Sequence, residues 1–262
     1  MQKLKRFFIN LCVGYGLDVF TLRRGLKGTL RMFRDYQQFS RQSRHLKDFS
    51  FDFTYPCPAD RFEESGVASG HYFHQDLLVA RRIFERRPAR HVDVGSRVDG
   101  FVAHVASFRN IEVLDFRPIT KTVKNIIFRQ FDLMDSAGQF DAWCDSLSCL
   151  HTLEHIGLGR YGDRVMVDGY IKGFQILWSM LKPDGIFYLS VPIGPQRIEF
   201  NAHRVFAVRT ILDMAMDKYE LLSLSFVDDR GDLHENVDIS EEAIEKSYAC
   251  WYGCGIFEFR KK

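Results

Sequence analysis

Cysteine is scarce in this sequence, and its spacing is that of isolated thiols. The six cysteines of the 262-residue chain form no Cys-x-x-Cys pair and no dense cluster. A small fold held together by disulfides is therefore excluded. Cys144 and Cys149 lie in or beside an apolar run, where a thiol acts as a small hydrophobic side chain. This pattern is typical of a reducing compartment, and we expect a cytoplasmic protein.

Long apolar runs are also missing. The stretch FFINLCVGYGL, which follows the basic start MQKLKR, ends at Asp18 and falls short of the roughly 20 residues that span a bilayer. It also lacks the small-residue cleavage site of a signal peptide. With 46% hydrophobic and 14% aromatic residues, the chain can bury one substantial core. We therefore expect one catalytic domain with an extension.

Charge is nearly balanced overall, at a net +2, but it is unevenly distributed. Residues 1–50 hold eleven Lys and Arg against three Asp, whereas residues 51–262 hold 25 Lys and Arg against 31 Asp and Glu. This asymmetry predicts an anionic partner for the basic segment, residues 1–53. Its basic side chains interleave with apolar ones in a way that fits one or two amphipathic helices. They are Lys3, Lys5, Arg6, Arg23, Arg24, Lys27, Arg31 and Arg34.

Two interpretations of the basic segment stay open. Its helices could lie on an anionic membrane surface, which would place the protein at the periphery of the inner membrane. The alternative, which we favour, is a helical arm packed on its own domain or on a second subunit of a homo-oligomer. We expect no nucleic-acid partner.

The rest of the chain alternates strand-like and helix-like patterns. Residues 54–70 contain two prolines and two glycines, which indicates a connection into the domain at 71–262. Alternation of this kind predicts an α/β fold, a Rossmann-like doubly wound sheet with helices on both faces. The seven expected strands lie near 90–95, 111–116, 126–131, 142–148, 185–192, 219–227 and 254–260, and the helices near 76–87, 100–108, 163–181, 206–217 and after the N-cap Ser240.

Acids and a glycine mark the ends of the first three predicted strands. Gly95 follows Asp93 and Val94, and a glycine there lets the backbone turn tightly and lets a ligand approach its amides. Asp115 lies 20 residues after Gly95, where an acid accepts hydrogen bonds from ribose hydroxyls. Asp132 follows the third strand. Because ligands of such sheets bind beyond the carboxyl ends of parallel strands, these residues predict a nucleotide site.

Two longer strings add specificity. Phe140-Asp141 opens a strand that ends in CLHTLEHI at 149–156, and LKPDG at 181–185 precedes a strand that ends in Val191-Pro192. Together with the motifs above, and in this order, they resemble class I S-adenosylmethionine-dependent methyltransferases, including O-methyltransferases of the ubiquinone pathway. The resemblance covers residues 70–262 approximately. It implies a mostly parallel seven-stranded sheet whose last strand is reversed.

The resemblance also implies that S-adenosylmethionine is the cofactor. The first loop departs from the Gly-x-Gly-x-Gly pattern of these enzymes, because Arg97 replaces the middle glycine and the next glycine is Gly100. Arg97 cannot adopt a positive φ cheaply, and its guanidinium could meet the carboxylate of the methionine moiety. Asp132 and the Leu133 backbone would contact adenine. The predicted cofactor-binding residues are Asp93, Gly95, Arg97, Gly100, Asp115, Asp132 and Leu133.

Other strings resemble a bacterial methyltransferase-like family found among surface-polysaccharide genes. They are GHYFHQDL at 70–77, DVGSRVDGF at 93–101, FNAHRVF at 200–206 and YGCGIFEFRK at 252–261. This second resemblance implies methyl transfer to a hydroxyl of a sugar, glycan or nucleotide sugar in polysaccharide biosynthesis. The side chains predicted to contact that acceptor are His71, Tyr72, His74, Gln75, Glu199 and Arg204.

Methyl transfer to a hydroxyl requires a base as well as an aligned acceptor. A histidine is the natural base near neutral pH. We rank His151 first, because the end of the fourth strand faces the methyl group in the methyltransferase fold, and His203 second. His151→Ala is therefore expected to keep cofactor affinity and to lose turnover.

The segment around His151 also spells His-x-x-Glu-His, the inverted motif of some zinc proteases. That function requires a continuous helix through 151–155, whereas a predicted strand leads into the motif and Gly157 follows it. A divalent ion held by His151, Glu154 and His155 is a weaker option. The simpler role of Glu154 and His155 is to form hydrogen bonds with the strand-to-helix turn. We therefore predict no metal-binding residues.

Two other functions share parts of these motifs. An NAD-dependent oxidoreductase acting on a nucleotide sugar would use the same acids and glycines, but the sequence contains no Tyr-x-x-x-Lys hydride site. A non-catalytic module with the methyltransferase fold would tether an assembly through the basic segment. Thermal-shift titration with S-adenosylhomocysteine and with NAD separates these functions.

Overall fold

The chain divides into two compact units, Met1–Val67 and Ala68–Lys262. The computed structural model describes residues 2–43, 48–135 and 138–262, without the side chains of residues 2–7 and 19. The basic side chains of Lys3, Lys5 and Arg6 therefore lie outside the described ones. The predicted extension at 1–53 and most of the predicted connection at 54–70 belong to the first unit.

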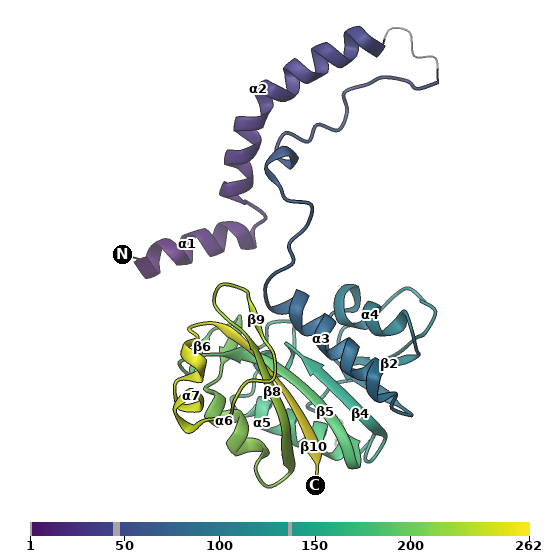
Figure 1. Ribbon diagram of the computed structural model, residues 1–262, viewed down its shortest axis with the longest axis vertical. Helices are drawn as coiled ribbons and strands as arrows, with labels where there is room; N and C mark the ends of the chain where they lie inside the picture. The colour runs from purple at the N-terminus through teal and green to yellow at the C-terminus, as the bar shows by residue number, and fades with distance from the viewer. Residues whose placement is uncertain (1, 44–47, 136–137) are drawn as a thin grey trace. The chain divides into compact units, whose positions relative to one another are not determined.

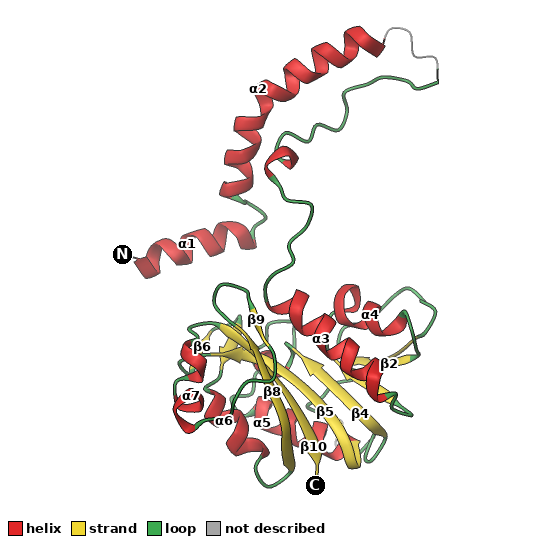
Figure 2. Cartoon of the chain, in the orientation of Figure 1, coloured by secondary structure: helices red, strands yellow, loops and turns green. Residues whose placement is uncertain are grey.

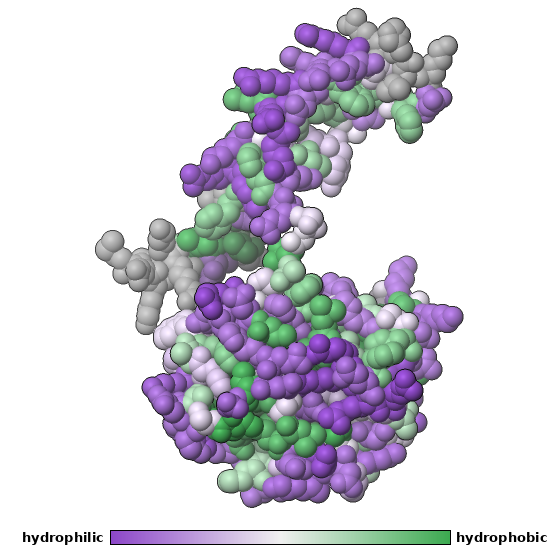
Figure 3. Space-filling view, in the orientation of Figure 1, coloured by the Kyte–Doolittle hydropathy of each residue, from purple (hydrophilic) through white to green (hydrophobic). Residues whose placement is uncertain are grey.

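The first unit is built on two helices, α1 (Gln2–Gly14) and α2 (Val19–Gln42) (Figure 1). Asp18 caps α2, because its carboxylate accepts hydrogen bonds from the backbone N–H groups of Phe20 and Thr21 at 2.8 and 3.2 Å. Figure 3 shows apolar side chains at the surface along α2, and its Leu26 and Leu30 are 69% and 73% exposed. No helix in the described part of the chain combines the length and apolar character needed to cross a membrane. The membrane and oligomer contacts of this segment stay predictions.

Residues between Phe51 and Phe62 contact α2 within the same unit. The ring of Tyr36 lies between those of Phe51 and Phe53, with centroid distances of 5.3 and 4.7 Å. A Cβ at Gly28 would lie 1.7 Å from the carbonyl oxygen of Pro58, so the helix needs a glycine where this segment crosses it. The short turn η2 (Asp60–Phe62) follows. Part of the predicted connection is thus packed on a helix.

The second unit is built around an eight-stranded sheet with the order β3-β2-β1-β4-β5-β10-β8-β9 (Figure 2). The first five strands of this order pair in parallel, and β10 runs antiparallel between β5 and β8. The predicted Rossmann-like sheet with a reversed last strand is confirmed. The strands are β1 (His91–Val94), β2 (Ile111–Asp115), β3 (Ile126–Gln130), β4 (Cys144–Leu150), β5 (Leu181–Ile193), β8 (Tyr219–Val227) and β10 (Gly253–Lys261).

The sheet has one strand more than the seven predicted. The additional strand, β9 (Leu233–His234), has two residues and pairs with the end of β8. Two residues carry no periodic pattern, so sequence alternation could not predict this strand. A separate hairpin of β6 (Arg197–Glu199) and β7 (His203–Val205) follows β5 in the chain.

Helices cover both faces of the sheet, as predicted. Leu78 and Phe101 belong to an apolar cluster on one face, and Phe174 and Ile211 belong to a second cluster on the other. The first face is covered by α3 (His71–Arg86), the π-type turn η3 (Val98–Val102) and α4 (Ala103–Ala106). The second is covered by α5 (Gly169–Met180) and α6 (Val208–Ala215). The remaining helical elements are η4 (Leu153–His155), α7 (Glu241–Glu245), which Ser240 caps as predicted, and η5 (Ser247–Ala249).

The helix predicted over 163–181 is shorter than expected, because it begins at Gly169. The Asp163 carboxylate accepts hydrogen bonds at 3.1–3.2 Å from three backbone N–H groups, those of Gly157, Gly159 and Tyr161. A side-chain acceptor of this kind competes with helical hydrogen bonds. The segment after β4 is therefore a loop, and it forms one side of the candidate site.

Candidate active site

A cavity of about 560 Å³ opens at the carboxyl ends of β1, β2, β3 and β4. Loops that follow these four strands, including Tyr161 after β4, form most of its wall, and Tyr72 of α3 completes it. Ligands of a doubly wound sheet bind at this place. Five of the seven predicted cofactor residues line the cavity, namely Gly95, Arg97, Asp115, Asp132 and Leu133.

Gly95 allows the loops after β1 and β4 to approach each other. Its φ of +75° lies in the region that favours glycine, and its N–H donates to the Leu114 carbonyl at 2.9 Å. A Cβ at this position would lie 2.4 Å from Cγ2 of Thr152. Any larger residue would therefore displace the loop after β4, which forms the opposite wall of the cavity.

Asp93 and Gly100 lie behind the β1 loop and do not line the cavity. The Asp93 carboxylate is buried and accepts hydrogen bonds from the Ser96 N–H at 3.0 Å and from the hydroxyls of Ser96 and Ser148, both at 2.5 Å. A Cβ at Gly100 would lie 2.5 Å from Oδ2 of Asp76. Both residues thus shape the loop from within, and direct contact of either with a cofactor stays a prediction.

Burial makes Asp93 a pH-dependent element of stability. Burial raises its pKa from 3.8 to about 7, although its hydrogen bonds to Ser148 and Ser96 oppose the shift. The folded protein therefore binds this proton more tightly than the unfolded chain does. The resulting stabilisation is complete below pH 3.8 and is lost as the pH rises through about 7.

Asp93→Asn keeps the shape of the side chain but cannot ionise. Relative to the wild type, we expect this variant to gain on the order of 2 kcal/mol of unfolding free energy when the pH is raised from 5 to 8. Urea denaturation of both proteins at the two pH values measures this difference. A difference between them that does not change with pH would contradict the assignment.

Arg97 lies at the cavity wall and is paired within its own loop. Its Nε and Nη2 donate to the two carboxylate oxygens of Asp99 at 3.1 and 2.8 Å, and its guanidinium carbon lies 5.2 Å from the centre of the Tyr72 ring. Both members of this pair are more than half exposed, and such pairs contribute little to stability. An incoming carboxylate can therefore replace Asp99 at small cost.

Asp115, at the end of β2, is held by Arg117. One carboxylate oxygen accepts from the backbone N–H and Nε of Arg117 at 2.8 and 3.1 Å, and the other accepts from Nη2 at 2.9 Å. The guanidinium carbon of Arg117 lies 4.6 Å from the centre of the Tyr161 ring. A carboxylate offers about four lone-pair sites. Asp115 can therefore accept one more hydrogen bond, and a second requires Arg117 to give one up.

Asp132 and Leu133 form a turn after β3. The Asp132 carboxylate accepts a hydrogen bond from the Met134 N–H at 2.9 Å, and both residues line the cavity. The Leu133 side chain is buried against α5, where a Cβ at Gly173 would lie 3.1 Å from its Cδ2. This turn lies on the cavity wall next to the β2 loop, because β2 and β3 are paired neighbours in the sheet.

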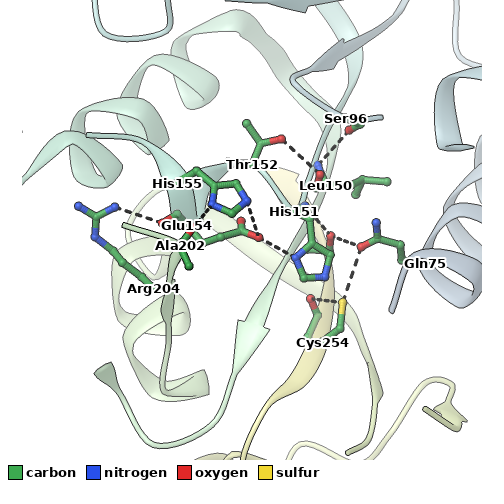
Figure 4. A network of polar contacts seen from close by, with 12 residues as sticks. Gln75, Ser96, Leu150, His151, Thr152, Glu154, His155, Ala202, Arg204 and Cys254 are labelled. Carbon is green, nitrogen blue, oxygen red and sulfur yellow. Dashed lines mark hydrogen bonds and ion pairs between the residues drawn. The ribbon is translucent and has the colours of Figure 1, made fainter. Parts of the chain in front are cut away.

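His151 lies directly after β4 and lines the cavity. Its Nδ1 is 2.6 Å from Oε1 of Glu154, and both side chains are at most 4% exposed (Figure 4). Burial alone would lower the pKa of His151, but the neighbouring Cys254 and Glu154 raise it well above its usual value. The raised pKa favours the protonated form of His151 in this arrangement. A role as general base requires that proton to leave first.

The second candidate base, His203, lies on β7 outside the cavity lining. Its Nε2 is 3.8 Å from Oε2 of Glu199, and burial lowers its pKa. Glu199 also accepts a hydrogen bond from Nε of Arg197 at 2.9 Å. The ring of Tyr252 lies 5.0 Å from that of His203 and 5.3 Å from that of His71. These contacts connect the His203 pair to the residues around His151.

The other predicted acceptor contacts lie at different depths. Tyr72 lines the cavity, and His71 stacks on His151 with ring centroids 5.2 Å apart. Gln75 is buried on α3, where its amide oxygen accepts a hydrogen bond from the Ser190 hydroxyl at 2.5 Å. His74 packs edge-on against Phe73 of the same helix. Only Tyr72 of these four lies where it meets a ligand in the cavity directly.

Arg204 fastens the loop that follows β4. Its guanidinium is buried and donates hydrogen bonds to three backbone carbonyl groups, those of Glu154, Ile156 and Val167, at 2.7–3.3 Å. The same group lies 4.9 Å from the centre of the Tyr170 ring. These contacts position Glu154, and through it His151. The predicted contact of Arg204 with an acceptor is not tested by them.

Three residues of the site were not singled out from the sequence. Arg117 lies two residues after Asp115 in a loop without a motif, and only the structure brings Tyr161 to Arg117. Cys254 lies within the string YGCGIFEFRK, which was noted only for its resemblance. Its position beside His151 depends on the pairing of β10 with β5.

The fold is similar to that of solved methyltransferases. The N-methyltransferase NodS from Bradyrhizobium japonicum WM9 superposes with a TM-score of 0.50 at 12% identity, covering 74% of this chain and 99% of NodS. NodS in complex with S-adenosyl-L-homocysteine gives 0.49 at 12% identity, covering 86% and 97%. The 1,6-didemethyltoxoflavin-N1-methyltransferase from Burkholderia thailandensis, with bound 1,6-didemethyltoxoflavin and S-adenosylhomocysteine, gives 0.49 at 14% identity, covering 72% and 78%. At 12% identity, the superposition with a TM-score of 0.50 bears on the fold alone.

Comparison of sequences leads to a family without an assigned activity. No curated protein matches this sequence, and the resemblance to a polysaccharide-associated family stays a prediction. The family described as "Caenorhabditis protein of unknown function, DUF268" matches residues 107–250. This match runs from the turn before β2 to the end of η5 and covers more than half of the chain. The chain therefore belongs to the DUF268 family.

Proposed function

We propose that this protein is an S-adenosylmethionine-dependent methyltransferase. The observation that carries the proposal is the convergence of Gly95, Asp115 and Asp132 on one cavity at the carboxyl ends of three neighbouring strands. Asp115 would accept hydrogen bonds from the ribose hydroxyls. Asp132 and the Leu133 backbone would contact the adenine, and the β1 loop with Arg97 would hold the methionine end.

The residues of this chain would mainly bind and orient the two substrates. The bound cofactor supplies a methyl group on a positively charged sulfur. That methyl carbon would be the electrophile for an acceptor oxygen, with the carbon–sulfur electron pair kept by sulfur and the proton of the acceptor hydroxyl released to water. Alignment of the acceptor supplies much of the rate. The walls of the cavity, which include the Tyr72 ring and the loop after β4, would provide that alignment.

We further propose that the acceptor is a hydroxyl group of a sugar, glycan or nucleotide sugar. The polar groups that α3 and the loop after β4 contribute to the cavity support a hydroxylated acceptor, because they combine aromatic faces with hydrogen-bonding groups. They are Tyr72, His151, His155, Tyr161 and Asp163. The role in polysaccharide biosynthesis rests on the sequence resemblance alone.

Isothermal titration calorimetry with S-adenosylhomocysteine tests the cofactor assignment. We expect the full chain to bind one equivalent, and Asp115→Ala to weaken binding at least about tenfold, because a charged hydrogen-bond acceptor contributes about 1.5–3 kcal/mol. Glu220→Ala is the matched control. Glu220 is an exposed acid at the start of β8, on the opposite edge of the sheet, where it pairs with Arg260 at 3.2 Å.

The two variants distinguish a specific site from a general effect of charge. Equal loss of affinity in Asp115→Ala and Glu220→Ala would show that Asp115 does not contact the cofactor specifically. Heat on titration with NAD but not with S-adenosylhomocysteine would contradict the methyltransferase proposal and favour the NAD-dependent oxidoreductase. Absence of heat with both nucleotides would contradict both enzyme functions and favour a non-catalytic module.

A further inference from the structure

Three potential metal ligands from distant parts of the sequence meet beside the cavity. His71 begins α3, His151 follows β4, and Cys254 is the second residue of β10. One ligand atom from each residue lies within 4.8 Å of the other two. All three residues belong to the second unit. We propose that His71, His151 and Cys254 form a zinc-binding site.

The first observation in favour is the buried second nitrogen of His151. Its Nδ1 is engaged by Glu154 at 2.6 Å, whereas its Nε2 is buried with no hydrogen-bond partner among the described residues. Figure 4 shows that the edge of the ring opposite Glu154 faces Cys254. Leaving a buried polar atom without a partner costs about 1–3 kcal/mol. A metal ion between His151 and Cys254 would satisfy this nitrogen.

The second observation is the support of both histidines from behind. A metal-bound histidine usually donates its other N–H to a carboxylate or a backbone carbonyl, which fixes the tautomer and the orientation of the ring. Glu154 occupies this position for His151. For His71, burial lowers the pKa to about 4, and the nearby Tyr252 backbone opposes this shift, as a carbonyl facing the ring N–H would. Glu154 is in turn held by Arg204, which donates to its backbone carbonyl at 3.3 Å.

The donor set and its charge favour zinc. Two imidazole nitrogens and one thiolate suit Zn²⁺, whereas Mg²⁺ and Ca²⁺ prefer oxygen ligands. Zinc binding would deprotonate the Cys254 thiol, and the resulting thiolate and the buried Glu154 carboxylate would together match the two positive charges of the ion. Oε2 of Glu154 is buried without a hydrogen-bond partner in the described structure, and buried charges are normally paired or bound to metals.

Three protein ligands leave one position of a tetrahedral zinc ion open, as in catalytic zinc sites. His151 and Tyr72 both line the cavity, and their ring centroids are 5.0 Å apart. If the proposed function holds, an acceptor hydroxyl bound at the open position would have a lowered pKa. It would lose its proton to water, and the oxygen would then attack the methyl carbon. His151 would serve as a metal ligand, and no base would be needed there.

Zinc binding to the full chain tests the site directly. The metal-free protein is equilibrated with zinc chloride and desalted, the bound zinc is measured by mass spectrometry, and the affinity is obtained by competition with a chromogenic chelator. We expect one zinc ion per wild-type chain. His71→Ala, His151→Ala and Cys254→Ala should each weaken binding more than about 100-fold, and Glu154→Gln, which removes only the supporting charge, about 10–100-fold.

Cys250→Ala is the matched control for the thiol. Cys250 is also a buried cysteine, but its sulfur lies near the Tyr248 carbonyl, at 3.8 Å, and it is not part of the cluster. This variant should keep the wild-type affinity. Equal loss in Cys250→Ala and Cys254→Ala would point to non-specific binding by thiols and overturn the proposal.

Cobalt substitution of the wild-type chain gives a result that does not depend on the folding of a variant. Co²⁺ in this site should show a thiolate-to-cobalt charge-transfer band and intense tetrahedral ligand-field bands. Failure of the wild type to bind zinc, or a cobalt spectrum without the thiolate band, would overturn the proposal. Calorimetry with S-adenosylhomocysteine on the same sample separates the two hypotheses. Zinc uptake without heat from S-adenosylhomocysteine would support the zinc site and contradict the proposed methyltransferase function. Heat from S-adenosylhomocysteine without zinc uptake would support the proposed function and contradict the zinc site.

Discussion

Replacing Gly95 with alanine is expected to weaken S-adenosylhomocysteine binding at least about tenfold and to lower the free energy of unfolding by about 2–4 kcal/mol. Two effects add at this residue. Alanine at a φ of +75° is strained, and the new Cβ would lie 2.4 Å from Cγ2 of Thr152. The loop after β4 must then move, and with it the wall that carries His151. Urea denaturation and calorimetry on the variant measure the two losses.

Gly138→Ala is the matched control for Gly95→Ala. Gly138 has a similar φ of +83°, but the nearest atom to an added Cβ, Oδ2 of Asp141, is 4.0 Å away. The free energy of unfolding of this variant should fall by only about 1 kcal/mol, the cost of the backbone conformation. The variant should bind S-adenosylhomocysteine like the wild type. Similar losses of stability in the two variants would show that the contact with Thr152 does not matter.

Removing the Glu258 side chain is expected to have the largest effect on stability. Glu258 on β10 is buried, and its Oε2 accepts a hydrogen bond at 2.9 Å from Nη1 of Arg82, a buried arginine on α3. Its Oε1 accepts from Arg86 of the same helix. Glu258→Ala removes the closest negative charge to the buried Arg82 guanidinium and leaves it with the more distant Glu235 carboxylate at 3.9 Å, so we expect a loss of about 3–5 kcal/mol in urea denaturation.

The double variant Arg82→Met, Glu258→Met separates a buried charge from lost packing. With both charges replaced by apolar side chains of similar volume, it should be more stable than Glu258→Ala. Glu220→Ala serves as the exposed control, because it breaks a surface pair and should cost less than about 1 kcal/mol. A double variant less stable than Glu258→Ala would show that the ion pair itself stabilises the packing of α3 on the sheet.

The strand ends of the candidate site could be located from the sequence because each combines two local signals. An apolar run of five or six residues predicts a buried strand, and the acid or glycine after it marks where the strand ends. Gly95, Asp115 and Asp132 were placed in this way, and all three line one cavity. Parallel strands bring such ends to the same edge of a sheet, so the sequence order was enough to predict that they meet.

The surroundings of His151 could not be predicted in the same way. Cys254 and His71 are remote from His151 in the sequence, and no short motif connects the three residues. Their approach depends on the register of β10 against β5, in which Cys254 pairs with Pro192, and on the start of α3 at His71. A shift of one residue in that register would turn Cys254 to the other face of the sheet.

The reversed last strand was expected only from the family resemblance. Local chemistry in the sequence by itself determined the α/β class and the residues at the strand ends. These features follow from periodicity and from neighbouring residues along the chain. Only the tertiary structure decided which side chains face the cavity and which lie behind it. Asp93 and Gly100 pack behind the β1 loop, Arg204 fastens the loop after β4, and His71, His151 and Cys254 meet. Burial and long-range strand register place these groups, and neither quantity is encoded in a short stretch of sequence.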